Sequence, residues 1–382
     1  MKTLIVTLSI ALLFSACTLD DGTQVNTSLT SVSGPGGGGD TIAIYGKNIP
    51  TYGDSITLSL NDEFMRVIAV TRDSILAIVP EMAGSGQIQA RVKKNIFEVA
   101  FTYRYKTTVT TIAGSGAAGR DNGDSTNATF NEPWGLALDG TTLYICDGYN
   151  GLIRKVDVNT KVVTSITPLN GFFSAYNLAV DTISHQLFVT NFNTDLLRVE
   201  PDGSSSIIYQ GEMPIAGVAV GPDRKVYFNN NTNGRIYRVD PDGLNDTLLV
   251  ANGPLTPRNM FFDATGTLWV SAYGIYTVSS GGVLSLYKEY YANQGWEIAR
   301  DKKGNIYSAD HFSNTLSMIE KSTGKVIVIA GSGNAEDVDG EGLNAGFNGP
   351  MGITIDNKGV LYVTTYNFET AGGNKVRKIV VR

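Results

Sequence analysis

The chain has 382 residues, a formal net charge of −6, 43 glycines and only two cysteines. The acidic balance argues against nucleic acid and anionic phosphate ligands as partners held by bulk electrostatics. After Cys17 the only cysteine is Cys146, so no internal disulfide is expected and stability must come from the hydrophobic core, for which the length suffices to build two domains.

Residues 1–17 have the pattern of an export signal. Lys2 precedes an apolar run from Leu4 to Phe14, which is shorter than the ~20 apolar residues that a bilayer span requires. The run ends in Phe14-Ser15-Ala16-Cys17, which resembles the bacterial lipobox. The resemblance implies a lipoprotein signal peptide and lipidation at Cys17. The alternative is ordinary secretion with an incidental cysteine.

Asp20-Asp21 follows the cysteine and resembles the acidic signal of some surface-exposed Bacteroidota lipoproteins. We therefore expect a lipid-anchored protein of the outer membrane or cell surface, with the side of the outer membrane left open. Residues 18–27 lack periodicity and are expected to form a flexible spacer.

Residues 28–105 contain short alternating runs between turn signals, which is typical of a small antiparallel sandwich. Ser33-Gly34-Pro35, the strand Thr41–Gly46, Ile78-Val79-Pro80, Gly84–Ala90 and the closing Phe101-Thr102-Tyr103 resemble an IPT/TIG domain. That resemblance implies an immunoglobulin-like fold.

From residue 106 to 382 a unit of roughly 40 residues recurs. Each unit has a turn residue after an apolar strand, and then a strand with an aromatic at one fixed place. We expect these aromatics to pack blade against blade. The turn residues are Asp139, Asp181, Gly221, Asp263, Asp301 and Asp356, and the aromatics are Tyr144, Phe188, Tyr227, Trp269, Tyr307 and Tyr362.

Four strands in each of six units predict a six-bladed β-propeller. Asn150–Val156, Asn233–Val239 and Asn374–Ile379 resemble NHL repeats. The fold class is therefore all-β, an IPT/TIG sandwich followed by an NHL-type propeller.

One stretch of 24 residues occurs twice, as Ile112–Gly135 and Ile329–Gly352, with 13 identities at an offset of 217 residues. The sixth unit ends after three strands, and Thr108–Ala113 aligns with the fourth strand of unit five. We therefore expect Thr108–Ala113 to close the last blade as its outer strand, which removes a free sheet edge.

In a propeller blade, the loops entering the first strand and those joining the second and third strands share one face, here called the top. Function is expected at the top mouth. A ring of equivalent positions there reads Trp134, Tyr176, Ala216, Arg258, Trp296 and Met351, and the next ring includes Asn177, Asn259 and Glu297. Aromatic faces can stack on sugar rings, while Asn, Arg and Glu can hydrogen-bond hydroxyls.

The second-to-third loops add polar and aromatic candidates for the same ligand. Asn and Asp also favour tight turns, so a purely structural role for these loop residues stays open. The ligand-binding candidates in these loops are Tyr149, Phe192, Tyr273, His311 and Tyr366.

No catalytic set is predicted. The two histidines, His185 and His311, cannot form a three-histidine zinc site. A weaker alternative is a divalent-metal site made of Glu132, Asn177, Asn259 and Glu297, because Ca²⁺ prefers such oxygen ligands. A structural Ca²⁺ in the twin loops is a further alternative, with ligands from Asp337, Asp339, Glu341, Asp121 and Asp124.

Two main functions follow. The first is a non-catalytic surface lipoprotein that captures a glycan. The resemblance to lipoproteins that combine IPT/TIG and NHL modules implies that its partner is an outer-membrane complex for polysaccharide uptake. The second is a metal-dependent lactonase, hydrolase or lyase. A protein-binding scaffold is the third alternative.

Overall fold

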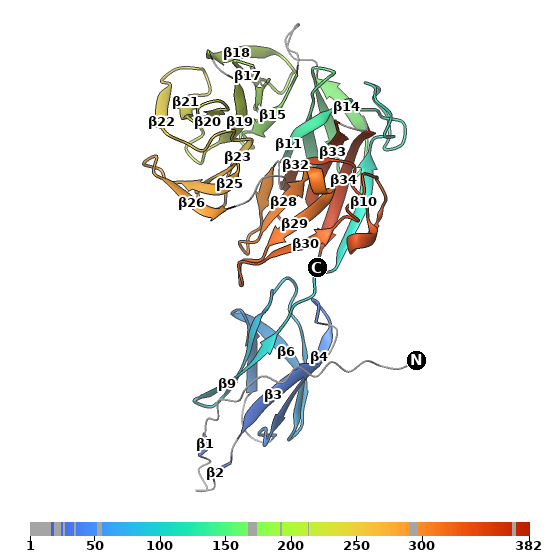
Figure 1. The fold of residues 1–382 in the computed structure, drawn as a ribbon, viewed down its shortest axis with the longest axis vertical. Helices are drawn as coiled ribbons and strands as arrows, with labels where there is room; N and C mark the ends of the chain where they lie inside the picture. Colours follow the sequence, from blue (N-terminus) through green and yellow to red (C-terminus); the bar gives the residue numbers. More distant parts are fainter. Residues whose placement is uncertain are drawn as a thin grey trace. The chain divides into compact units, whose positions relative to one another are not determined.

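The computed structural model describes residues 17–18, 24–25, 27–33, 36–51, 56–166, 174–191, 193–212, 214–289, 297–368 and 372–382. The chain divides into two compact units: residues up to Lys106 with 320–325 and 381–382, and residues 107–319 with 326–380 (Figure 1). No helix in these described ranges is long and apolar enough to cross a bilayer.

The first unit is antiparallel and contains a seven-stranded sheet in the order β3-β4-β7-β6-β5-β8-β9 and a separate two-stranded pair, β1-β2. Strand β6 joins its two halves, because Met65 pairs with β5 while Arg66 pairs with β7. Ile44, Leu60 and Ile88 are buried between the halves. The strands are β1 (Cys17–Thr18), β2 (Gln24–Val25), β3 (Ser28–Ser33), β4 (Thr41–Lys47), β5 (Ile56–Leu60), β6 (Glu63–Val70), β7 (Ser74–Ile78), β8 (Gly86–Val92) and β9 (Asn95–Phe101).

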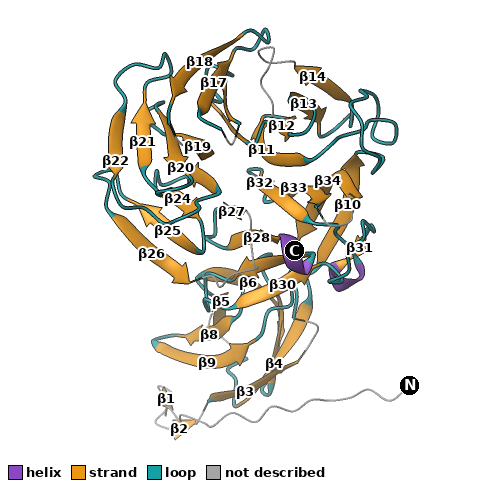
Figure 2. Ribbon diagram, turned by 45° about the horizontal axis from the view of Figure 1, so that its top comes forward, coloured by secondary structure: helices purple, strands orange, loops and turns teal. Residues whose placement is uncertain are grey.

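The second unit is the expected six-bladed propeller, and Figure 2 shows its sheets arranged around a ring. Blades one to three consist of β11 (Pro133–Asp139), β12 (Thr142–Asp147), β13 (Leu152–Asp157) and β14 (Val163–Ile166); β15 (Asn177–Val180), β16 (Leu187–Thr190), β17 (Asp195–Val199) and β18 (Ser205–Gln210); and β19 (Ile215–Val220), β20 (Val226–Asn230), β21 (Ile236–Val239) and β22 (Thr247–Val250).

Blades four to six complete the ring. They consist of β23 (Asn259–Phe262), β24 (Leu268–Ser271), β25 (Gly274–Val278) and β26 (Leu284–Glu289); β27 (Ile298–Arg300), β28 (Ile306–Asp310), η1 (His311–Ser313), β29 (Thr315–Ile319) and β30 (Val326–Ala330); and β31 (Gly340–Glu341), η2 (Gly342–Asn344), β32 (Pro350–Ile355), β33 (Leu361–Asn367) and β34 (Gly372–Val381).

The recurring turn residues and aromatics have the roles expected of a repeat. Asp356 accepts hydrogen bonds through Oδ1 from the main-chain nitrogens of Lys358 and Val360, so its side chain holds the turn between β32 and β33. Tyr227 of blade three packs edge to face on Phe262 of blade four, with ring centroids 4.8 Å apart.

The ring closes as the sequence predicts. Strand β10 (Thr107–Ala113) pairs with β34 as the fourth strand of the last blade. The short β31 then covers the outer edge of β10, and Asp339 accepts hydrogen bonds at 2.8 Å from both the nitrogen and the hydroxyl of Thr111. No repeat or alternating pattern in the sequence predicts this fifth strand.

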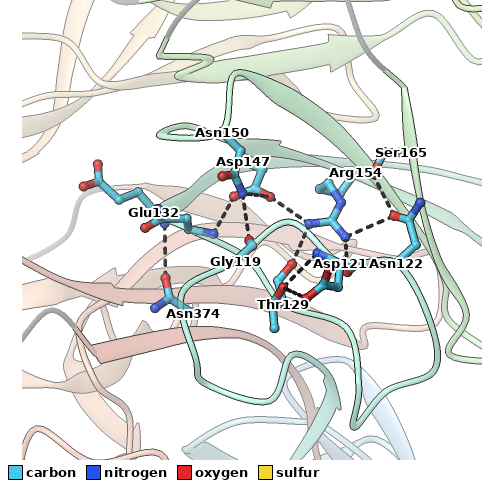
Figure 3. Close-up of polar contacts among 11 residues, drawn as sticks. Gly119, Asp121, Asn122, Thr129, Glu132, Asp147, Asn150, Arg154, Ser165 and Asn374 are labelled. Carbon is cyan, nitrogen blue, oxygen red and sulfur yellow. Dashed lines mark hydrogen bonds and ion pairs between the residues drawn. The ribbon is translucent and has the colours of Figure 1, made fainter.

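Each copy of the 24-residue stretch folds around one buried arginine. In blade one, Arg154 on β13 donates to the carbonyls of Thr129 and Asp121 and pairs with Asp147 at 2.8 Å (Figure 3). Its guanidinium also stacks over the ring of Phe130. Arg154 thus binds the loop and the neighbouring strand together.

Arg377 on β34 repeats this arrangement in blade six. It donates to the carbonyls of Gly346 and Val338, which lie 217 positions after Thr129 and Asp121, and it stacks over Phe347. Its ion-pair partners are Asp337 and Asp339. Asp337 and Asp339, two of the candidate calcium ligands, therefore form ion pairs with an arginine.

The neutralising acid comes from different places in the two blades. Asp147 lies on a strand, and the equivalent residue of blade six is Thr365. Asp337 lies in a loop, and the equivalent residue of blade one is Arg120. Asp147 accepts from the main-chain nitrogen of Asn131, and Asp337 accepts from its twin, Asn348. Each carboxylate thus pairs with Nη1 of its arginine and accepts from the same main-chain position, although one acid comes from a strand and the other from a loop.

Candidate functional site

The predicted inner ring lies at the starts of the first strands, and several of its side chains are buried rather than open to a ligand. Tyr176 and Met351 are buried, whereas Trp134 and Arg258 are partly exposed. Trp296 lies outside the described residues, so the structure gives no position for it.

An arc of aromatic side chains crosses four blades at the top. Trp134 meets Tyr176 edge to face at 4.5 Å and Phe368 at 5.7 Å between ring centroids. Phe368 also contacts His311 at 5.3 Å and Tyr366 at 5.1 Å, and His311 contacts Phe312 at 4.9 Å. We call these six residues the aromatic arc.

The two most exposed members of this arc are sequence neighbours of predicted residues. Phe312 is 57% exposed and Phe368 is 44% exposed, whereas the predicted His311 and Tyr366 are buried beside them. The sequence does place an aromatic shortly after Asp310 and Asn367 in these loops. Which aromatic of each loop is exposed depends on how the loop turns, and this cannot be read from the sequence.

Arg258 lies at one end of the arc. Its guanidinium donates to the phenol of Tyr176, whose pKa is raised mainly by burial. Burial, with Arg258 contributing, lowers the pKa of His311 to about 4, against main-chain hydrogen bonds at Gly349 and Pro350. His311 is therefore neutral at physiological pH.

Glu297 and Asn177 form a buried polar pair on the inner ring. The amide Nδ2 of Asn177 donates to Oε1 of Glu297 at 2.9 Å and to the carbonyl of Arg258 at 3.2 Å. The nitrogen of Ile353 donates to the other carboxyl oxygen at 3.3 Å. Burial nevertheless raises the pKa of Glu297 to about 8, so this carboxyl is largely protonated at neutral pH.

Two further asparagines surround Gly217. Asn229 accepts from the nitrogen of Gly217 at 3.2 Å, and a Cβ added at Gly217 would lie 2.8 Å from Asn229 Nδ2. Asn259 is buried beside the same glycine. Its Oδ1 has no hydrogen-bond partner within the described ranges, and neither has Asn229 Nδ2. Within that part of the chain, Asn259 Oδ1 is thus an acceptor, and Asn229 Nδ2 a donor, available to a ligand.

Glu132 lies where the twin loop enters β11. Its carboxylate accepts a hydrogen bond from the phenol of Tyr366 at 2.8 Å, and burial, together with this contact, raises the pKa of Tyr366 to about 12. The pair therefore joins blade one to blade six beside the aromatic arc.

Two of the four residues of the metal alternative use an oxygen for other partners. Glu132 binds Tyr366, and Oδ1 of Asn177 accepts from the nitrogen of Leu178 at 2.7 Å. Across the part of the chain that the structure describes, no three His, Cys, Asp or Glu side chains are grouped to hold a metal ion. Cys146 is buried behind the ring, where desolvation raises the pKa of its thiol.

Two predicted residues extend outward from the top loops. Tyr149 is 71% exposed in blade one and Tyr273 is 59% exposed in blade four, and both lie in the loops that join second and third strands. Phe192, the corresponding aromatic of blade two, lies outside the described residues.

Comparisons with known proteins agree with this architecture. The IPT/TIG domain family matches residues 25–105. The chicken (Gallus gallus) NHL repeat-containing protein 2 is 25% identical over 270 residues, which are 66% of this chain and 32% of that protein. The chain thus spans about a third of the length of this relative.

Solved structures show the same fold at low sequence identity. An auxiliary nutrient binding protein from Bacteroides ovatus has a TM-score of 0.60 at 19% identity, covering 93% of this chain and 98% of that one. A gluconolactonase from Xanthomonas campestris has a TM-score of 0.53 at 14% identity, covering 72% and 90%. The chain therefore consists of an IPT/TIG domain followed by a six-bladed propeller of the NHL-repeat type.

Proposed function

We propose that the protein captures a glycan at the top mouth of its propeller. The observation that carries this proposal is the aromatic arc, in which six contacting rings continue from blade two through blades one and six to blade five. The apolar C–H faces of sugar rings pack on such surfaces, and exposed aromatics in a concave setting are typical of ligand sites.

Polar groups beside the arc supply the complementary chemistry. Arg258 offers a donor beside Tyr176, Glu132 offers an acceptor beside Tyr366, and Asn259 adds a buried acceptor oxygen without a partner in the described chain. A ligand rich in hydroxyl groups can hydrogen-bond to all three. A purely apolar ligand would leave the Asn259 oxygen desolvated without a partner from the ligand or the described chain.

The cellular setting is part of the same proposal. Lipidation at Cys17 would anchor the chain in the outer membrane, and capture at the cell surface would deliver polysaccharide to an uptake complex. The fold shared with Bacteroides auxiliary nutrient binding proteins supports this setting. Replacing Cys17 by Ser should move the protein from the membrane fraction to the soluble fraction of its host, and retention in the membrane would contradict the lipid anchor.

Glycan binding can be tested by calorimetry on the chain after Cys17. The titrants are soluble polysaccharides, both neutral and acidic, each with and without a chelator. Binding of one class at micromolar to millimolar affinity, unchanged by chelator, is the expected result. A panel without binding would contradict the proposal and favour a protein-binding scaffold, which a pull-down with exposed top-loop variants would then test.

One observation favours an enzymatic alternative. Glu297 is a buried carboxyl with a pKa of about 8, and proton donors in active sites are often tuned in this way. A lactone or glycoside hydrolysis assay with the wild type and Glu297→Gln tests this reading. Turnover that the substitution abolishes would establish it, and absence of turnover with measurable glycan binding would exclude it for those substrates.

A further inference from the structure

The contact between Glu132 and Tyr366 arises from a reciprocal exchange between the twin blades. Position 132 of the first loop corresponds to Gly349 of the second, and Gly148, which directly follows β12, corresponds to Tyr366 near the end of β33. The same main-chain hydrogen bond joins the two positions in each blade, from Gly148 to Glu132 at 2.9 Å and from Tyr366 to Gly349 at 2.8 Å.

In blade one the glycine of this pair is at the strand end, Gly148, and in blade six it is in the loop, Gly349. In blade six the glycine is required, because a Cβ on Gly349 would lie 2.2 Å from the carbonyl oxygen of Tyr366. In blade one the loop position instead carries Glu132. The two side chains that this exchange provides, Glu132 and Tyr366, meet across the blade boundary at 2.8 Å.

Glu132 adopts a backbone conformation that suits glycine better. Its φ is +59°, close to the +66° of its twin Gly349. The left-handed region is unfavourable for residues with a Cβ. The side-chain oxygen of Asn374 accepts from the main-chain nitrogen of Glu132 at 3.1 Å, which stabilises this backbone conformation. The side chain of Glu132 extends away from Arg154 and its partners (Figure 3). Strain at a residue that contacts a candidate site suggests a functional reason for its side chain.

We propose that Glu132, positioned by Tyr366, is a hydrogen-bond acceptor for hydroxyl groups of an uncharged sugar bound on the aromatic arc. This inference rests on the proposed glycan function and names its ligand class. A carboxylate has two oxygens with about four acceptor sites, so it can keep Tyr366 while it accepts from a ligand. The ring centroids of Tyr366 and Phe368 are 5.1 Å apart, so the Glu132 carboxylate that binds Tyr366 lies close to the aromatic arc.

The carboxylate also selects against charge. A uronate or a sulfated sugar stacked next to Glu132 would bring two negative charges together, and that repulsion is strong where water is partly excluded. The ligand on this side of the mouth is therefore a neutral glycan.

The experiment measures affinity and stability of the same variants. The probes are xyloglucan, galactomannan, arabinoxylan and mixed-linkage β-glucan as neutral glycans, with polygalacturonate and alginate as acidic ones. We expect a neutral probe to bind the wild type, Glu132→Gly to bind it about 10- to 100-fold more weakly, and Tyr366→Phe to show a smaller loss. The denaturation midpoint of Glu132→Gly should stay close to that of the wild type, because relief of strain offsets the lost contact.

Lys161→Gly is the matched control, since Lys161 also has a left-handed φ, +62°, in the turn between β13 and β14. It should leave affinity unchanged. Unaltered affinity of Glu132→Gly for a neutral probe would overturn the inference while the glycan function stands. Binding of acidic probes alone would overturn the ligand class. Absence of binding to every probe would instead remove the proposed function on which the inference rests.

Discussion

The side-chain amide of Asn177 donates to the buried carboxyl of Glu297 at 2.9 Å, although 120 residues separate them in the chain. This contact joins blade two to the start of blade five across the inner ring. The nitrogen of Ile353 adds a contact from blade six. One protonatable group thus connects three blades of the propeller.

This connection predicts a pH dependence of stability. The pKa of Glu297 rises from 4.5 to about 8 on folding. Between those values the folded protein keeps a proton that the unfolded chain has released, so stability falls as the pH rises toward 8 and levels off above it.

Relative to Glu297→Gln, the wild type should lose roughly 3–5 kcal/mol over this range. Urea denaturation of both proteins from pH 5 to pH 9 measures the difference. Parallel stability curves for wild type and variant would show that Glu297 does not titrate in this way.

The acids that neutralise the two buried arginines, Asp147 in blade one and Asp337 in blade six, give a second prediction. Asp147→Ala leaves Arg154 buried without its carboxylate and should cost about 3–5 kcal/mol. The equivalent strand position in blade six behaves differently, because Asp337 neutralises Arg377 there. Thr365 is buried and its hydroxyl has no partner in the described chain, so Thr365→Val should be nearly neutral or stabilising.

Asp337→Ala completes this comparison. Asp339 still pairs with Arg377 at 3.0 Å, so we expect a loss of about 1–3 kcal/mol, smaller than that of Asp147→Ala. Chemical denaturation midpoints rank the three variants. Equal costs at Asp147 and Thr365 would contradict the exchange.

Ring closure predicts a third effect. Asp339 accepts two hydrogen bonds from Thr111 on β10 and also pairs with Arg377 on β34. Asp339→Ala should loosen the outer strand before the rest of the ring unfolds. Hydrogen exchange should show faster exchange in 107–113 and 340–341 with unchanged protection in blades two to four. Uniform acceleration through the propeller would indicate global destabilisation instead.

Much of the architecture was predictable because repetition reveals it. A turn residue and an aromatic at fixed places in each unit predict six blades, and the missing strand of unit six predicts that Thr108–Ala113 completes it. The structure confirms both. The strand β31 was not predictable, because two residues in a loop carry no periodicity.

The site was predictable only in part. Counting along the repeats located Trp134 and Tyr176 at the mouth, and they do contact each other. Counting could not show that Tyr176 is buried, or that Phe368 bridges Trp134 and His311. Those contacts link loops of different blades, and their geometry follows from tertiary packing rather than from local pattern.

The most direct test of the glycan site compares the affinities of four proteins for a glycan that binds the wild type. Trp134→Ala and Phe368→Ala remove rings from the aromatic arc, and Phe64→Ala removes a ring that is 80% exposed in the first unit. Each arc substitution should weaken binding at least ~10-fold, about 1.4 kcal/mol, while Phe64→Ala binds like the wild type and all variants stay folded. Wild-type affinity in both arc variants would contradict glycan capture at the propeller mouth.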